Sequence, residues 1–363
     1  MTTVYIVSHE HYRNNTYEKE VLEINHLNPD KIVCLCMEEL GMEVGEPHFI
    51  FRKFFDKIRP WLERTGKVVT LVIPHMNYTI LEPGVITEAC QSLIFCNGNE
   101  VVNSVVPPYQ CLSVRPDNRN DILFTYYVNN ARVERAMMLE ALAKNDLIKY
   151  GVVTYKYPEK DVLNNNKFEP FPWKYHDGSK LADEPDYDFR KYTPYKFPKS
   201  FLSGVFDVVA ESRYNPGEFF LTEKTLKSIA AAKPFMVLGC KGFHSYLRDF
   251  FGFKLYEDMF DYSFDECDRI EDRIDGIIKN MLRLHSLGRG RQSMLYGKCV
   301  PSLLYNRYKV AEIYYDKNKI VPKSLRFLMD GGDHQVFVPD KNHWPPILHY
   351  MERMGWIKNT LLV

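Results

Sequence analysis

The chain has 363 residues, of which 45% are hydrophobic and 26% are charged, and its 47 basic side chains balance its 47 acidic ones. This composition predicts a folded protein of one large or two ordinary domains and excludes an intrinsically disordered chain. The zero net charge excludes a polycation that coats nucleic acid with its whole surface, but it leaves room for a local basic face.

Targeting and redox signals are few. No apolar run approaches the roughly 18 residues that cross a bilayer, and the first residues have neither the basic nor the long apolar region of a signal peptide. The eight cysteines are scattered and include no Cys-x-x-Cys pair. We therefore expect a cytoplasmic protein with reduced thiols, no membrane span, no disulfide framework and no structural zinc.

The first part of the chain alternates apolar runs with segments of helical pattern. The runs predict strands that are buried on both faces, at residues 4–7, 31–37, 67–74 and 92–96. A helix is predicted over residues 50–64, and the alternation indicates a parallel α/β domain. Ligands of such domains lie beyond the carboxyl ends of the strands, where the sequence places His9, Glu10, Glu38 and His75.

The rest of the chain repeats the pattern after a polar, proline-containing stretch near residues 107–120. Strands are predicted at residues 122–128, 152–155, 206–210 and 234–238, and helices at 136–149, 222–232, 243–250, 265–287, 302–315 and 345–357. The expected organisation is an N-terminal domain at 1–115, a second domain at 116–340 with an irregular excursion at 156–200, and a C-terminal helix at 341–363 that crosses back.

Several catalytic motifs are absent from the sequence. It has no Gly-x-x-x-x-Gly-Lys-Ser/Thr, no Gly-x-Gly-x-x-Gly after the first strand, no Gly-x-Ser-x-Gly, no His-Glu-x-x-His and no kinase catalytic loop. These absences argue against P-loop phosphotransferases, dehydrogenases, serine hydrolases, zinc proteases and protein kinases.

The most informative stretch is residues 211–239, where Thr222-Glu223-Lys224 opens a helix directly after a strand and a loop. A helix start offers unpaired N–H groups and a positive dipole end, which suit a phosphate. Lys224 adds a positive charge for a diphosphate, and the Glu223 carboxylate can accept two hydrogen bonds from a ribose diol. The alternative is a capped helix whose charges are solvated.

This stretch resembles the donor-binding signature of the α1,3-fucosyltransferases, and more loosely that of the exostosin-like enzymes. In that family a strand ends in Phe-Glu-Asn-Ser, a loop leads to Tyr-Val-Thr-Glu-Lys, and a helix precedes a strand with a Pro-Val-Val-like start. Here the strand ends in Ala210-Glu211-Ser212-Arg213, the loop leads to Phe220-Leu221-Thr222-Glu223-Lys224, and the next strand starts at Pro234. Ser212 and Phe220 depart from the family pattern, which leaves the nucleotide base and the sugar open.

A second match concerns the stretch Asn129–Arg135, which follows a strand and opens a helix. Related enzymes carry an arginine here that meets the donor phosphates, so Arg132 or Arg135 is the counterpart. The resemblance covers residues 121–265, and the whole chain is also similar to glycosyltransferase-like proteins of large DNA phages and marine viruses. It implies a GT-B fold, with two Rossmann-like domains facing each other across a cleft. The implied donor-binding residues are Arg132, Arg135, Glu211, Arg213, Thr222, Glu223 and Lys224.

The resemblance also implies an inverting transfer of a sugar from a nucleoside-diphosphate donor to a hydroxyl group. The cations and the helix start would stabilise the leaving diphosphate, so no metal and no tightly bound cofactor are expected. The N-terminal domain would supply the general base, with Glu10, His75 and His9 as the candidates.

The acceptor stays open between a glycan and a hydroxymethylated pyrimidine in viral duplex DNA, which would have to be flipped out of the stack. Residues 283–298 contain a basic run that can meet DNA phosphate or can form a solvated helix end followed by a loop. The competing interpretation is a non-catalytic protein with the same α/β frame that binds nucleotides or serves in an assembly.

Overall fold

A computed structural model describes residues 2–8, 17–35, 49–73, 83–89, 122–128, 132–155, 201, 204–214, 217, 219–338, 344, 346–359 and 361–362. The chain divides into two compact units, which are described separately below. Unit 1 comprises residues 1–99 and 313–363, and unit 2 comprises residues 100–312.

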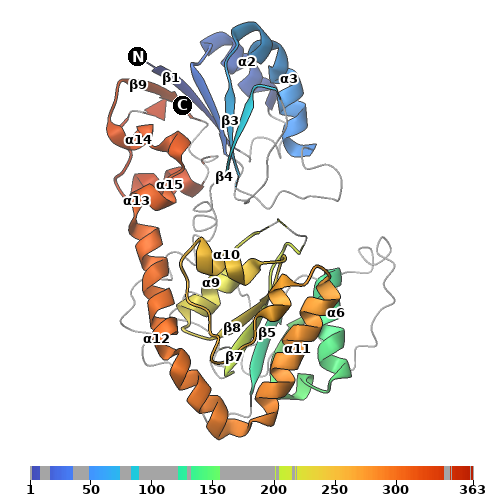
Figure 1. The fold of residues 1–363 in the computed structure, drawn as a ribbon. Helices are drawn as coiled ribbons and strands as arrows, with labels where there is room; N and C mark the ends of the chain where they lie inside the picture. The colour runs from blue at the N-terminus through green and yellow to red at the C-terminus, as the bar shows by residue number, and fades with distance from the viewer. Residues whose placement is uncertain are drawn as a thin grey trace. The chain divides into compact units, whose positions relative to one another are not determined.

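Unit 1 is built on a parallel sheet whose described strands lie in the order β10-β9-β1-β2-β3-β4. The strands are β1 (Thr2–Ser8), β2 (Lys31–Leu35), β3 (Val69–Ile73), β4 (Val85–Ala89), β9 (His334–Phe337) and β10 (Leu361–Leu362). Consecutive strands β1 to β4 extend the sheet in one direction, and β9 lies on the other side of β1 (Figure 1). The order therefore reverses between β1 and β9.

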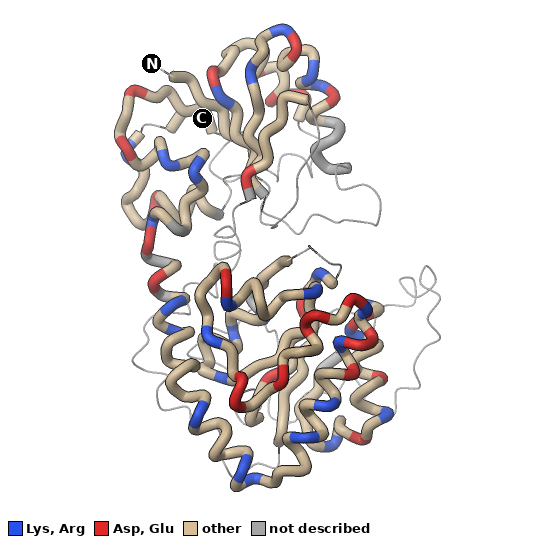
Figure 2. Tube along the Cα trace, viewed as in Figure 1, with Lys and Arg blue, Asp and Glu red and all other residues tan. Residues whose placement is uncertain are grey.

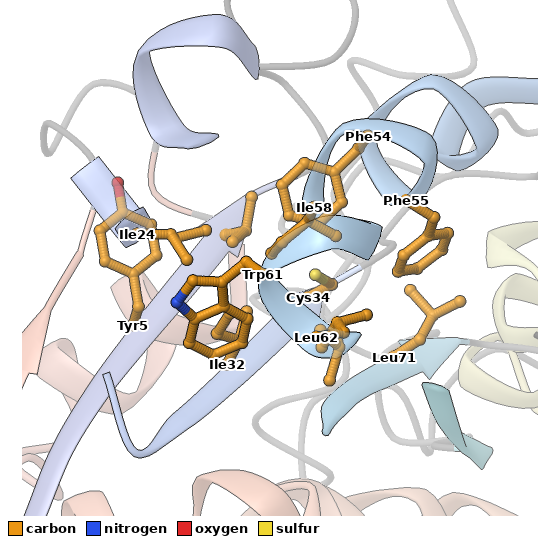
Figure 3. Packing of buried hydrophobic residues seen from close by; sticks show 12 residues of the cluster. Tyr5, Ile24, Ile32, Cys34, Phe54, Phe55, Ile58, Trp61, Leu62 and Leu71 are labelled. Atoms are coloured by element: carbon orange, nitrogen blue, oxygen red, sulfur yellow. The ribbon is translucent and has the colours of Figure 1, made fainter. Parts of the chain in front are cut away.

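Two helices cover one face of this sheet, α2 (Tyr17–Leu27) and α3 (Phe49–Thr65). Figure 3 shows the core beneath them, where Trp61 and Phe54 from α3 meet Ile24 from α2 and Tyr5 and Cys34 from the strands. The opposite face is equally buried, because the alternating strand residues Val4, Ile6, Val33, Leu35 and Val72 are at most 1% exposed. The sheet is thus covered on both faces, as its continuous apolar runs predict.

The C-terminal segment belongs to unit 1 well before the predicted boundary at residue 340. It forms α13 (Lys317–Ile320), η4 (Lys323–Leu325), α14 (Phe327–Asp330), β9, α15 (Pro346–Arg353) and β10. Val336 in β9 is fully buried between Val4 of β1 and Leu361 of β10. The Glu88 carboxylate of β4 also accepts the N–H groups of Lys323 and Ser324, at 2.7 and 3.1 Å. The C-terminal part of unit 1 therefore begins at Ile313, and it contributes strands as well as helices to that unit. The predicted boundary near 115 lies outside the described residues.

Unit 2 is built on a second parallel sheet, with the described strands in the order β6-β5-β7-β8. They are β5 (Phe124–Val128), β6 (Gly151–Tyr155), β7 (Phe206–Ala210) and β8 (Phe235–Leu238). β5 pairs with β6 along its whole length, but with β7 only through Phe124 and Thr125 at its amino end. The ladder between β5 and β7 thus stops before the carboxyl ends of the two strands.

The helical elements of unit 2 are α6 (Val133–Lys144), η2 (Ile148–Tyr150), α9 (Glu223–Ala230), α10 (Phe243–Asp249), η3 (Ser263–Glu266), α11 (Ile270–Ser286) and α12 (Gly288–Tyr315). α11 packs against α6 and η3, whereas α9 lies against β7 and β8 (Figure 1). α12 carries the chain out of unit 2, since the division between the units falls within its last turn.

The structure confirms the α/β class and most of the predicted elements. The strand at 206–210 has the predicted bounds, and Thr222 caps α9 as expected, with Lys224 N 3.2 Å from its Oγ1. The long helix α12 differs from the prediction, because it begins at Gly288 rather than Ser302 and leaves no loop after α11. The predicted strand at 92–96 and the excursion at 156–200 lie outside the described residues. Within the part described, no helix is long and apolar enough to cross a membrane.

Candidate functional site

The candidate site lies at the carboxyl ends of β5 and β7 in unit 2. The chain runs from β5 to β6 on one side and returns to β7 on the other, so the strand order reverses between β5 and β7. Parallel sheets bind ligands at such a point, because the loops there lead away to opposite sides. The segment after β5 leads to Arg132 and α6, and the segment after β7 contains Glu211–Tyr214 and leads to α9. The two stretches that the sequence analysis selected are therefore adjacent in the fold.

Glu211 fixes the start of α9 to the end of β7. Its Oε1 accepts the backbone N–H of Thr222 at 3.1 Å and the hydroxyl of Thr225 at 2.6 Å, and its Oε2 accepts the hydroxyl of Thr222 at 2.5 Å. The Glu211 residue is fully buried. Its negative charge lies at the positive end of the α9 dipole, which stabilises the helix start. In this structure Glu211 positions the start of α9, which differs from the donor binding that the resemblance implies for it.

Arg135 occupies the place where the ladder between β5 and β7 stops. Its Nη2 donates to the carbonyl oxygens of Ala210 and Glu211 at 3.4 and 3.2 Å, and the residue is only 3% exposed. Tyr126 of β5 donates its hydroxyl to the Arg135 carbonyl at 3.1 Å. The guanidinium therefore supplies donors to strand carbonyls near the point where the β5 ladder ends. This use of Arg135 favours Arg132 as the arginine that meets a phosphate.

Arg132 is the N-cap residue of α6 and is exposed. Its Nη1 donates to the carbonyl oxygen of Ser212 at 2.8 Å, so the side chain spans from the start of α6 to the segment after β7. A guanidinium carries five N–H donors in a planar fork, a geometry that matches phosphate oxygens. Arg132 therefore combines a fixed position, an exposed side chain and a permanent positive charge.

Tyr214 and Arg273 hold the far end of the same segment. The Tyr214 hydroxyl donates to the Glu211 carbonyl, and burial raises the pKa of this phenol above its ordinary value. Arg273 of α11 donates to the Tyr214 carbonyl at 2.8 Å and to the Cys267 carbonyl at 2.9 Å. Burial lowers the pKa of Arg273, although not enough to neutralise a guanidinium. The segment Glu211–Tyr214 is thereby held by side chains from the start of α6, from α9 and its N-cap, and from α11.

Positive side chains dominate this edge of the sheet. Lys224 is partly exposed and its Nζ lies 3.2 Å from the Thr222 hydroxyl, while Arg213 is 8% exposed within the segment after β7. Together with Arg132 they make three cationic residues on the segments that follow β5 and β7. Because Glu211 and the Thr222 hydroxyl already satisfy two N–H groups at the α9 start, side chains rather than backbone must provide most of the binding of an added anion.

The remaining predicted site residues divide into two groups. Glu223 is the first residue of α9, next to Lys224. His9, Glu10 and His75, the candidates for the general base, lie outside the described residues; β1 ends at Ser8 and β3 at Ile73, just before them in the sequence.

Sequence reasoning missed Thr225, Tyr214 and Arg273. Thr225 follows Thr222 by one helical turn, and this spacing was a usable signal that both hydroxyls face the same strand end. Tyr214 and Arg273 carry no such signal, because Arg273 reaches the segment from a helix much later in the chain.

His244 and Asp265 resemble a catalytic dyad but form a structural connection. Their side chains are bonded at 2.8 Å and are 1% and 3% exposed. The other ring nitrogen, Nε2, accepts the backbone N–H of Val237 at 3.0 Å, and Asp265 Oδ2 accepts the N–H of His244 at 2.8 Å. With both ring nitrogens engaged by buried partners, this histidine fastens α10 to β8.

No group of three or more His, Cys, Asp or Glu side chains that could hold a metal ion occurs among the described residues.

Comparison with known proteins gives no match to a protein-family model, a curated protein or a solved structure. The case for function therefore depends on the geometry of unit 2 and on the resemblance of residues 121–265.

Proposed function

We propose that this protein is a nucleotide-sugar-dependent glycosyltransferase of GT-B architecture, with unit 2 binding the donor and unit 1 contributing to the acceptor side. The observation that carries the proposal is the set of bonds at the end of β7. Glu211 fixes the start of α9, and Arg132 bridges from α6 to Ser212 at the point where strand order reverses. The same residues carry the resemblance to the fucosyltransferase donor signature.

The chemistry follows from where charge develops. In an inverting transfer the acceptor oxygen attacks the anomeric carbon, and the bond to the diphosphate oxygen breaks with its electron pair on the leaving group. The acceptor hydroxyl loses its proton to a general base. Arg132 and Lys224 supply positive charge for the leaving diphosphate, which stabilises the transition state without a metal ion.

The base and the acceptor belong to unit 1 in this proposal. In the sequence, His9 and Glu10 come directly after β1, and His75 comes shortly after Ile73 at the end of β3. A glycan hydroxyl and the hydroxymethyl group of a modified pyrimidine in duplex DNA are both acceptors of the required chemistry.

The test is a donor screen with the full chain. Purified protein is incubated with UDP-, GDP- and other nucleotide sugars, with or without duplex DNA that contains hydroxymethylcytosine or hydroxymethyluracil, and products are measured by mass spectrometry. A sugar-sized mass gain on the modified nucleoside supports DNA as the acceptor, and slow donor hydrolysis without it points to a glycan.

Site variants make the screen specific. Lys224→Ala is expected to lower kcat/KM by about thirtyfold or more, equivalent to at least ~2 kcal/mol of transition-state stabilisation. Lys144→Ala is the matched control, because Lys144 lies at the opposite end of α6 and its side chain is 71% exposed. Binding of a donor without turnover by any acceptor or by water would favour the non-catalytic nucleotide-binding alternative. Unchanged turnover by folded Lys224→Ala would remove the assigned role.

A further inference from the structure

The region from Gly276 to Ala311 has an unusual charge pattern. It contains seven basic residues and no Asp or Glu, although the whole chain has 47 of each sign. The basic residues are Lys279, Arg283, Arg289, Arg291, Lys298, Arg307 and Lys309. A globular chain with balanced charge places acidic residues among basic ones by default, so this separation along the sequence is unusual.

The fold places this region on the second half of α11 and most of α12. Lys279, Arg283, Arg289, Arg291 and Lys298 are exposed, whereas Arg307 is 6% exposed. Figure 2 shows lysine and arginine positions along α12 and at the end of α11, while the acidic positions of α11 are in its first half. Basic positions therefore run across the junction of these helices, with Asp258 beside Lys298 and Asp261 near Arg283 as acidic neighbours from another segment.

Exposed apolar side chains share one face of α12 with the basic ones. Arg291, Met294, Lys298, Tyr305 and Tyr308 follow one another at intervals of three, four or seven residues, which is the spacing of a single helix face. Met294 and Tyr308 are 56% and 51% exposed, and Tyr305 is 39% exposed. We call the face formed by these residues the α12 stripe.

The opposite face of α12 is buried. Cys299, Leu303 and Val310 are each 2% exposed, and Asn306 bonds to both the N–H and the carbonyl of Lys254 at 2.7 and 2.8 Å. The α12 stripe therefore faces solvent, because the opposite face of the helix packs against the rest of unit 2. Lys254 adds a further cation, with its Nζ 4.5 Å from the centre of the Tyr305 ring. One acidic neighbour is Asp258, 3.4 Å from Lys298.

We propose that the α12 stripe binds the surface of an anionic lipid bilayer, with α12 lying in the plane of the interface. A helix of 28 residues is about 42 Å long, so its exposed face can contact many headgroups at once. Lysine and arginine attract anionic headgroups, and exposed Met and Tyr side chains enter the boundary between headgroups and acyl chains. Duplex DNA would contact mainly the basic residues through its phosphates, so the exposed Met and Tyr side chains favour a lipid surface as the partner.

The test is sedimentation of the full chain with vesicles of phosphatidylcholine alone or with 30% phosphatidylserine, in low and in moderate salt. We expect binding to the anionic vesicles that weakens with salt and no binding to the neutral ones. Arg291→Gln and Lys298→Gln should each lower the partition coefficient about fivefold. Met294→Ser and Tyr308→Ser should each lower it at least about threefold, because they remove apolar area from the interface.

Matched controls lie on α2 in unit 1. Lys19→Gln removes a charge from a side chain that is 81% exposed, and Leu22→Ser removes an apolar residue that is 70% exposed. Both variants should bind vesicles as the unaltered chain does. The absence of binding to anionic vesicles would overturn the proposal. The proposal would also be overturned if Arg291→Gln and Lys298→Gln weakened vesicle binding while Met294→Ser and Tyr308→Ser left it unchanged. Binding of duplex DNA with the same pattern, measured in parallel, would then point to a nucleic acid as the partner.

Discussion

Lys233 and Asp207 form a buried polar network at the amino end of the unit 2 sheet. Lys233 Nζ donates to the Thr125 hydroxyl at 2.6 Å and to the Phe201 carbonyl at 2.5 Å. Asp207 accepts the hydroxyls of Thr125 and Ser228 at 2.8 and 2.5 Å. These bonds join β5 to β7 at the end where the two strands still pair, opposite the candidate site. Each residue of the pair is only 4% exposed, so the network depends on every partner being present.

Stability should depend on pH through Lys233. Burial lowers the pKa of this amine to about 8, although the Asp207 charge works in the opposite direction. Between pH 8 and the unfolded value of 10.5, the unfolded chain binds more protons at this site than the folded chain. The free energy of unfolding therefore rises with pH across that window, by up to about 3 kcal/mol.

The check is urea denaturation of the unaltered protein and of Lys233→Met, each at pH 7 and pH 10.5. Comparison with the variant cancels the titration of groups that do not interact with Lys233. The unaltered protein should gain stability relative to Lys233→Met at the higher pH. A difference between the two proteins that is the same at both pH values would show that Lys233 titrates normally.

At the scale of elements, glycine has opposite roles in α11 and α12. A Cβ at Gly276 of α11 would lie 2.3 Å from the Cβ of Phe264, so this glycine allows α11 and η3 to approach. Gly297 of α12 has no neighbour within 4 Å of such a Cβ and has an ordinary helical backbone. The same substitution should therefore have opposite effects at the two positions.

Gly276→Ala should lower the free energy of unfolding by about 1–3 kcal/mol, since the overlap outweighs the gain in helix propensity. Gly297→Ala should raise it by about 0.5–1 kcal/mol, because only the propensity changes. Midpoints of urea unfolding measure both effects. A shift of both midpoints in the same direction would contradict the close packing of α11 on η3.

The elements differ in how far local sequence predicts them. The strand at 206–210 and the cap at Thr222 were predicted correctly, because a continuous apolar run and a capping residue are local signals. β4 was not predicted, since it lies at the edge of the described sheet and carries Thr87 and Glu88 in place of a continuous apolar run. The start of α12 was missed because Gly288, Gly290 and Pro301 indicate a loop, whereas burial of one face keeps the segment helical.

In the candidate site, too, local sequence predicts which residues take part but not how they pack. The sequence selected Arg132, Arg135 and Glu211 together, and the topology of unit 2 brings them together. It did not separate the exposed Arg132 from the buried Arg135, because that depends on where the β5–β7 ladder stops. Nor did the sequence show that the Glu211 carboxylate accepts hydrogen bonds from the hydroxyls of Thr222 and Thr225, because those bonds depend on how α9 packs against β7.

At the scale of the whole molecule, unit 1 is assembled from both ends of the chain. β9 and β10 extend the sheet beyond β1, and residues 313–363 supply them. Unit 1 therefore cannot complete its sheet until the C-terminal segment is available, whereas unit 2 is continuous in sequence. A defect in β9 should for this reason affect β1 and β2 and spare unit 2.

Val336→Asp tests this dependence, because it places a carboxylate at a fully buried position of β9. It should destabilise unit 1 by about 3 kcal/mol or more. Hydrogen exchange should show lost protection in β1 and β2 with β7 and β8 unchanged. Gln335→Asp is the control, since Gln335 is the partly exposed neighbour in the same strand. Equal loss of protection in both units would show that they unfold together.

The most direct test of the central claim is calorimetric titration of the full chain with nucleoside diphosphates and their sugar conjugates. The donor site proposed at the end of β7 predicts that at least one nucleotide binds, and that Arg132→Ala and Lys224→Ala each weaken it at least about tenfold, the effect of a lost charge-assisted hydrogen bond. Lys144→Ala should bind as the unaltered protein does. No binding of any nucleotide, or binding that both site variants retain in full, would contradict the claim.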